Sequence, residues 1–173
     1  MEFIKIVWLC IGAAILYGIL HDQVTARVCV EYFTVGHPPV FQTVSPTLLA
    51  LGWGVIATWW VGLILGVPMA CVARLGSRPK MAARDLLKPI GVLLGCMAGL
   101  ALVAGVAGYF AANAGTVWLV GPICSRLPAE KHVAFIADLW SHLAAYGSGF
   151  VGGIVLCVWI WRTRGRRSAG AGR

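Results

Sequence analysis

Residues 20–46, LHDQVTARVCVEYFTVGHPPVFQTVSP, form a polar stretch between two long apolar runs, and this alternation decides the fold. The stretch contains two of the four histidines, two of the six acidic residues and one of the six cysteines. The whole chain is 60% hydrophobic and 12% charged, with a mean hydropathy of +0.85. A soluble domain is about 45–50% apolar and about 25% charged. The composition therefore indicates a chain whose natural solvent is the lipid bilayer.

Four apolar segments are long enough to cross a bilayer, which takes about 20 helical residues. The first run ends in Gly18-Ile19-Leu20, a poor cleavage site for a signal peptide, so we expect it to remain as a helix. The sequence predicts an all-α integral membrane protein, a four-transmembrane-helix bundle that forms one domain over residues 1–167. A basic tail at 168–173 is expected to be disordered. The predicted spans cover residues 3–20, 46–73, 89–112 and 141–161.

Basic residues are distributed unevenly between the predicted connections. Eleven of the 14 lie near the N-terminus, in the connector at 74–88 or after the last span: Lys5, Arg74, Arg78, Lys80, Arg84, Lys88, Arg162, Arg164, Arg166, Arg167 and Arg173. Cytoplasmic loops attract Lys and Arg. Both termini are therefore predicted to be cytoplasmic and the loops 21–45 and 113–140 extracytoplasmic, in the cell (inner or plasma) membrane. The same distribution explains the net charge of +8 without nucleic acid as a partner.

Ionisable side chains gather on the predicted outer side, at the ends of the spans. His21 and Asp22 follow the first span, while Asp138 and His142 lie one helical turn apart at the start of the fourth. Glu31 in the first outer loop is a further candidate. Ionisable groups near membrane depth are costly and are functional candidates by default. Histidines and carboxylates could bind zinc or iron here; the alternative is that hydrogen-bonded histidines only fix the loops.

The segment 24–44 shows two conflicting periodicities. Apolar and polar residues alternate over 24–32 and a Gly-His-Pro-Pro turn follows, which predicts a short β-hairpin over the bundle. A helical continuation of the first span is the alternative. In either conformation Arg27 and Glu31 share a face, so a structural salt bridge is the default expectation. The sharper hypothesis makes Arg27 an anchor for an anionic substrate.

Two further patterns predict contacts between parts of the bundle. Cys29 and Cys124 are the only cysteines predicted outside, one in each outer loop, and we consider a disulfide between them because that side is usually oxidising. Gly91, Gly95 and Gly99 recur at intervals of four in the third span. Such a ridge lets helix backbones approach closely. It is interpreted as the inner seam of the bundle or as a face for a homo-oligomer.

The sequence does not name a substrate or a reaction, so three functions remain open. Base rates favour a non-catalytic membrane component or partner-binding subunit, whose polar His/Asp/Glu cap is a docking surface. The alternative is a metal-dependent enzyme or metal-binding protein at the outer membrane edge, with the five clustered candidates as its acting groups. An oligomeric transporter or channel is less favoured, because the spans contain almost no internal charge. The lipid bilayer is the one partner that all three share.

Overall fold

The computed structural model describes residues 1–171 and, over these residues, contains helices and no strand. Four helical segments are long and apolar enough to cross a membrane, which confirms the all-helical class and the number of candidate spans. The helices are α1 (Glu2–Val28), α2 (Val30–Thr34), α3 (Pro46–Ile56), α4 (Trp59–Arg74), α5 (Arg84–Asn113), α6 (Pro122–Arg126), the 3-10 turn η1 (Ala129–Lys131) and α7 (His132–Ala171). The second candidate span consists of α3 and α4 together.

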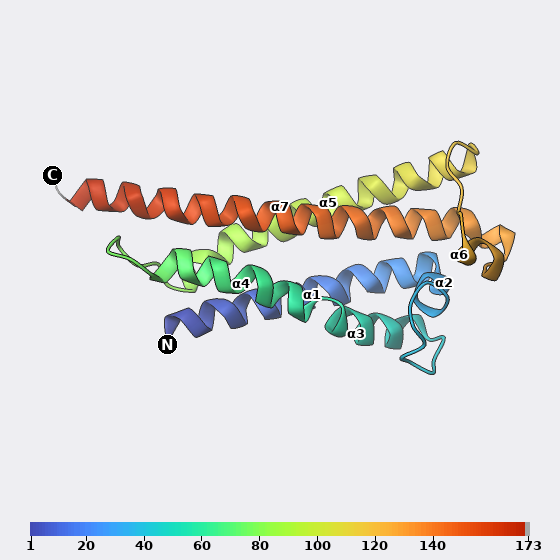
Figure 1. Ribbon diagram of the computed structural model, residues 1–173, viewed down its shortest axis with the longest axis horizontal. Coiled ribbons are helices and arrows are strands. Elements are labelled where there is room, and N and C mark those ends of the chain that lie inside the picture. The colour runs from blue at the N-terminus through green and yellow to red at the C-terminus, as the bar shows by residue number, and fades with distance from the viewer. Residues whose placement is uncertain (172–173) are drawn as a thin grey trace.

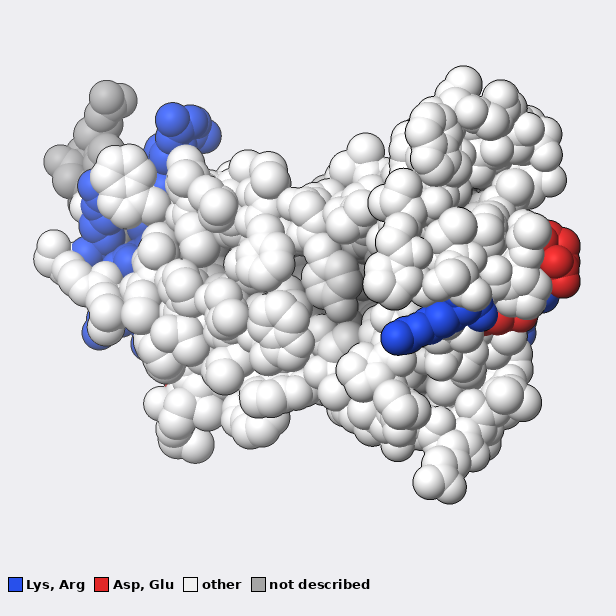
Figure 2. Space-filling view, turned by 45° about the vertical axis from the view of Figure 1, so that its right-hand side comes forward, with Lys and Arg blue, Asp and Glu red and all other residues white. Residues whose placement is uncertain are grey.

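The helices form two layers that lie along a common axis (Figure 1). Helices α5 and α7 pack along each other in one layer, and α1 packs against α3 and α4 in the other. Both termini and the α4–α5 connection lie at one end, whereas α2 and α6 lie at the opposite end. On the face in Figure 2, Lys and Arg gather at the first end, acidic side chains appear at the second end together with some Lys or Arg, and uncharged residues cover most of the middle.

The predicted β-hairpin at 24–44 is wrong, because α1 continues to Val28 and α2 follows almost at once. Helical spacing places Asp22, Thr25 and Ala26 on the buried face of α1, and Cys29 continues this face. A strand would send alternate residues of this set to opposite faces. The consequence is that His21 lies seven residues, or about 10 Å, inside the end of α1 and not in a loop.

Close backbone approach occurs between α1 and the α3–α4 pair. A Cβ added at Gly18 would lie 2.5 Å from Thr58 Cγ2 and 2.7 Å from the Gly54 carbonyl oxygen. By contrast, the predicted packing ridge Gly91, Gly95 and Gly99 is exposed and has nothing within 4 Å of such an atom. Its interpretation as the inner seam is therefore wrong, and the homo-oligomer face stays a prediction.

The second span is interrupted between Ile56 and Trp59, while Pro68 lies inside the unbroken helix α4. The Thr58 hydroxyl donates back to the Gly54 carbonyl, a local bond that competes with the regular ladder. The interruption leaves the Ala57 carbonyl free to accept a hydrogen bond from the Tyr146 hydroxyl of α7, at 3.2 Å. A bond between the two layers thus takes the place of a bond within the helix.

At the end that carries both termini, the guanidinium of Arg164 fixes the connection between α4 and α5. Arg164 is only 3% exposed. Its nitrogens donate to four backbone carbonyls: those of Val72, Leu75 (2.9 Å), Arg78 (2.8 Å) and Pro79 (2.9 Å). These carbonyls lie at the C-terminal end of α4 or just beyond it, where a helix dipole favours a cation. The tail predicted to be disordered over 168–173 is helical as far as Ala171, and residues 172–173 lie outside the described part.

Candidate metal site

A cluster of His21, Asp22 and His142 lies between α1 and α7, near the end of the molecule opposite to the termini. One ligand atom from each side chain can be chosen so that all three lie within 4.8 Å of one another. Asp22 is 5% and His142 is 8% exposed, so the cluster is largely shielded from solvent. These are three of the five candidates predicted from the sequence, and α1 and α7 supply them together.

The hydrogen bonds of His142 fix which of its ring nitrogens faces the cluster. Nδ1 lies 2.8 Å from the backbone oxygen of Asp138, one turn earlier on α7. A carbonyl oxygen can only accept, so Nδ1 carries the proton and Nε2 of the neutral ring has a lone pair. This Nε2 lies 3.3 Å from Asp22 Oδ1, which is also an acceptor when ionised. Two acceptors therefore face each other and require a cation or a proton between them.

Two more buried polar atoms in this region lack a partner. Within the part of the chain that the structure describes, neither His21 Nε2 nor Asp138 Oδ2 has a hydrogen-bond partner. Asp138 is 1% exposed and stands outside the group of three ligands, although its backbone holds the His142 ring. Buried polar groups are normally hydrogen-bonded, and each exception calls for a physical explanation.

The charges around the cluster also favour a bound cation. Asp22 and Asp138 are both buried, and among the described residues no Lys or Arg forms an ion pair with either of them. Moving a single carboxylate out of water costs several kcal/mol unless a counter-charge is present. One divalent cation would neutralise both carboxylates and bind the lone pairs of the two imidazoles.

The spacing of the ligand atoms fits one metal ion at one pair and requires contraction elsewhere in the group. A zinc ion with tetrahedral ligands lies about 2.0–2.2 Å from nitrogen and oxygen, so two of its ligand atoms are about 3.3–3.6 Å apart. The 3.3 Å between His142 Nε2 and Asp22 Oδ1 matches this separation, whereas the limit of 4.8 Å for the whole group exceeds it by roughly 1.2–1.5 Å, which side-chain rotation on metal binding would supply. The residues present therefore fit a metal with two nitrogen ligands and one carboxylate.

Aromatic rings surround the two histidines of the cluster. Tyr17, one turn before His21 on α1, stacks on it with ring centroids 5.6 Å apart and an interplanar angle of 12°. Tyr32 of α2 stacks on His142 at 4.3 Å and 24°. Neither tyrosine was predicted from the sequence to belong to the site. The i, i+4 spacing of Tyr17 and His21 was an available signal, whereas the role of Tyr32 was hidden by the predicted hairpin.

The other two histidines have structural hydrogen bonds. His37 Nδ1 lies 2.8 Å from the Tyr32 carbonyl oxygen, and His132 Nε2 lies 3.1 Å from that of Leu127. Both rings donate to a backbone acceptor five residues earlier in the chain. These bonds fit the expectation that histidines fix the loops. His37 and His132 therefore differ in role from His21 and His142, which belong to the cluster.

Arg27 and Glu31 do not form the predicted salt bridge, and each has another partner. Arg27 donates to the side chain of Gln23 at 2.7 Å and to Thr47 Oγ1 at 2.8 Å, so it joins α1 to the start of α3. Glu31 pairs with Lys131 Nζ at 3.2 Å. Neither belongs to the group of three ligands, and the predicted anion anchor lies on the exposed surface.

Cys29 and Cys124 are both free thiols, so the structure does not contain the disulfide predicted between them. Cys29 is buried and its Sγ lies 3.5 Å from Glu31 Oε2. Burial raises the pKa of Cys29 to about 12, with the neighbouring carboxylates contributing. A thiol with so high a pKa is a weak nucleophile in disulfide exchange, because the thiolate is the reactive form.

Comparison with protein-family models, with curated proteins and with solved structures finds no match to this chain.

Proposed function

We propose that this chain is an integral membrane protein that binds a divalent transition metal through His21, Asp22 and His142. The observation that carries the proposal is the contact of 3.3 Å between His142 Nε2 and Asp22 Oδ1, with the other ring nitrogen already committed to a backbone carbonyl. Metal-binding histidines usually donate their second nitrogen in this way, which fixes the tautomer and the ring orientation.

A bridging proton is the competing explanation for that contact. It would join His142 to Asp22, but it would leave His21 Nε2 and Asp138 Oδ2 without partners. A metal ion would take His21 as a further ligand, and its charge would offset both buried carboxylates. The metal therefore accounts for more of the buried polar atoms than a proton does.

The ligand set supports zinc or iron and leaves a coordination position for chemistry. Two histidines and one carboxylate with an open position are typical of catalytic zinc sites and of non-haem iron oxygenases. Structural zinc sites usually have four protein ligands. This supports a metal-dependent enzyme in preference to a purely structural metal site.

The charge distribution supports an orientation in the membrane. The end that holds both termini and the α4–α5 connection carries most of the Lys and Arg, so we assign it to the cytoplasm. The metal cluster then lies in the extracytoplasmic half of the bundle, in the cell membrane. Attachment of a reporter enzyme to the 113–121 loop, active only outside the cytoplasm, would test this assignment.

A partner-binding role is the second candidate, and exposed apolar side chains at the α2 and α6 end favour it. Val44, Trp118 and Val120 are 76%, 69% and 74% exposed in the loops there. A docking surface for another membrane component would cover them. Loss of a co-purifying partner on changing Trp118 and Val120 to serine, with metal content unchanged, would support this role.

Elemental analysis of the purified protein tests the metal proposal. We expect about one zinc or iron per chain, and less than a tenth of that in the His142→Ala and Asp22→Asn variants, because loss of one of three ligands removes most of the affinity. His132→Ala is the matched control, since His132 bonds only to a backbone carbonyl outside the cluster. A wild-type protein without metal after growth with zinc and iron, or variants that retain it, would contradict the proposal.

A further inference from the structure

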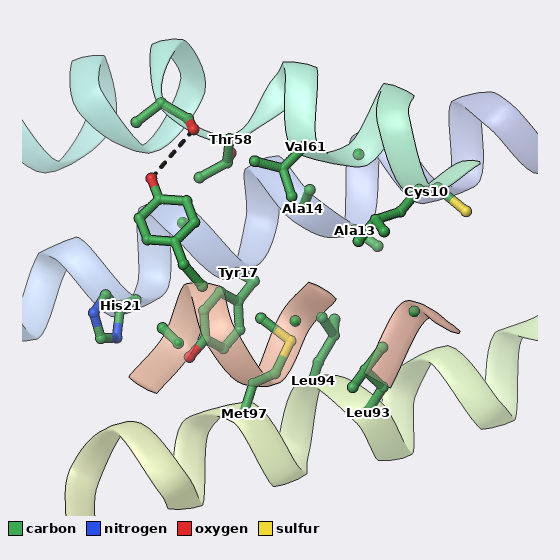
Figure 3. A pocket seen from close by; sticks show the side chains of 18 of the residues that line it. Cys10, Ala13, Ala14, Tyr17, His21, Thr58, Val61, Leu93, Leu94 and Met97 are labelled. Atoms are coloured by element: carbon green, nitrogen blue, oxygen red, sulfur yellow. Dashed lines mark hydrogen bonds between the residues drawn. The ribbon is translucent and has the colours of Figure 1, made fainter. Parts of the chain in front are cut away.

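A narrow cavity of about 120 Å³ extends from the metal cluster between the two helix layers toward the inner half of the bundle (Figure 3). His21 and Asp22 line its outer end together with Tyr17. The rest of the lining is mainly apolar and comes from α1, α2, α4, α5 and α7, with Ala13, Ala14, Leu93, Leu94, Met97 and Leu156 among the lining residues. One continuous space therefore joins a polar end to a hydrocarbon-like end.

The polar end has unused hydrogen-bonding capacity. Tyr17 and His21 extend from α1 into the space between the layers (Figure 3). Among the described residues, the Tyr17 hydroxyl has no hydrogen-bond partner although its oxygen is buried, and the same is true of His21 Nε2. A metal would engage His21 but not the phenol. The Tyr17 hydroxyl thus needs a polar atom that the chain itself does not supply.

We infer that the cavity binds a membrane-soluble amphiphile with a neutral, oxygen-bearing head group, an alcohol or an ester carbonyl, and a hydrocarbon tail. This inference rests on the proposed metal site and names the substrate class for it. The head group oxygen would lie at the open metal position and within reach of Tyr17, and the tail would lie along Ala13, Leu93 and Leu94.

The charges of the cluster favour a neutral head group. A divalent ion balances Asp22 and Asp138, so a charged head group would add an uncompensated buried charge. The volume limits the enclosed part of the tail: a cavity of about 150 Å³ lined by aliphatic side chains accommodates benzene. The cavity of about 120 Å³ is therefore suited to a single short hydrocarbon segment, with any longer tail leaving toward the bilayer.

Photo-crosslinking in phosphatidylcholine nanodiscs tests this inference. The probe is a short fatty alcohol with a diazirine in its tail, and the comparison probe has the same tail with a trimethylammonium head. We expect the alcohol to form adducts on cavity-lining Leu93 and Met97, and an excess of unlabelled fatty alcohol to remove them. The cationic probe should label only lipid-facing residues such as Leu102, which is 68% exposed.

Variants of the cavity wall sharpen the test. Ala13→Leu should reduce the cavity adducts by about tenfold, because the larger side chain occupies the space of the tail. Ala98→Leu, at an exposed position of α5, is the matched control and should leave them unchanged. The competition experiment uses the wild-type chain and does not depend on how the variants fold.

Metal content measured on the same samples separates the two proposals. Metal without competable cavity adducts would overturn the amphiphile inference and leave the metal site standing. Competable cavity adducts without metal would support the amphiphile inference and contradict the proposed function. Equal labelling of Leu93 and Met97 by both probes would also overturn the inference, because it would show unselective access by lipid-like molecules.

Discussion

The two ends of this molecule both bury charged side chains, and they differ in how these side chains are satisfied. Arg164 donates to four backbone carbonyls near the C-terminal end of α4. At the other end, His142 Nε2 faces a carboxylate, and His21 Nε2 and Asp138 Oδ2 have no partner among the described residues. A saturated buried charge has a structural role, whereas an unsaturated cluster of acceptors needs something that the chain does not contain. This difference separates the candidate site from ordinary buried polarity.

The largest loss of stability is expected when Arg164, whose guanidinium has a full set of hydrogen-bond partners, is replaced. Arg164→Met should lower the free energy of unfolding by about 3 kcal/mol, because four buried carbonyls lose their donor and the α4–α5 connection loses its attachment to α7. Denaturant titration in detergent micelles would measure this change, with metal content unaffected. Arg162→Met, at an exposed position two residues earlier, is the control. Equal stability of the two variants would mean that the Arg164 contacts are not structural.

A smaller change in stability is expected for Asp22 in the cluster, and its sign should depend on whether metal is present. In the presence of a chelator, Asp22→Asn should be more stable than the wild type by about 1–2 kcal/mol, because it removes a buried carboxylate that has no counter-charge. With saturating zinc the wild type should become the more stable protein, since binding stabilises only the chain that retains the site.

Thermal unfolding with and without zinc would measure this reversal. Glu130→Gln at an exposed position should show no such dependence on metal. If Asp22→Asn were less stable than the wild type under both conditions, the Asp22–His142 pair would be a structural ion pair and the contrast between the two ends would be lost.

The smallest change in stability is expected for the Glu31–Lys131 pair. Burial alone would raise the pKa of Glu31, but hydrogen bonds from its own backbone N–H, from Lys131 and from Cys29 together hold it below the ordinary value of 4.5. A carboxyl with a lowered pKa stabilises the fold above its unfolded pKa, and this stabilisation is lost as the pH falls through the folded pKa.

Glu31→Gln should therefore be less stable than the wild type near pH 7, by less than about 1 kcal/mol because the pair is partly exposed. The two proteins should converge as the pH falls through the lowered folded pKa of Glu31, because the carboxyl is then protonated in both the folded and the unfolded state. A stability difference that persists at acid pH would show that Glu31 acts through packing and not through its charge.

The four long apolar helices could be predicted from the sequence because they depend on composition and length alone. Runs of about 20 apolar residues match the length of a membrane-spanning helix, which pairs all its backbone hydrogen bonds within one segment. The hairpin failed because residues 24–32 satisfy both the strand and the helix periodicity. Burial of Asp22, Thr25 and Ala26 on one face of α1 decided between them, and this depends on contacts that a single sequence does not display.

The candidate site was predictable only in pieces. The Asp138–His142 spacing and the adjacent His21–Asp22 pair could be read from the chain, but their meeting depends on α1 and α7 being neighbours. Glu31 was included because it was expected to lie in the same cap, but it pairs with Lys131 and lies outside the group of three ligands. The inner-seam prediction for the glycines of the third span failed for a related reason. Their spacing shows that they share one face of the helix, but not whether that face points into the bundle.

X-ray absorption at the metal K-edge of the purified wild-type protein tests the central claim most directly. The proposed site predicts a first shell of nitrogen and oxygen ligands at about 2.0–2.2 Å, with the multiple-scattering signature of two imidazoles. It also predicts that this signature falls to one imidazole in any metal retained by His21→Ala. A spectrum with sulfur ligands, or one without imidazole scattering, would contradict a metal bound by His21, Asp22 and His142.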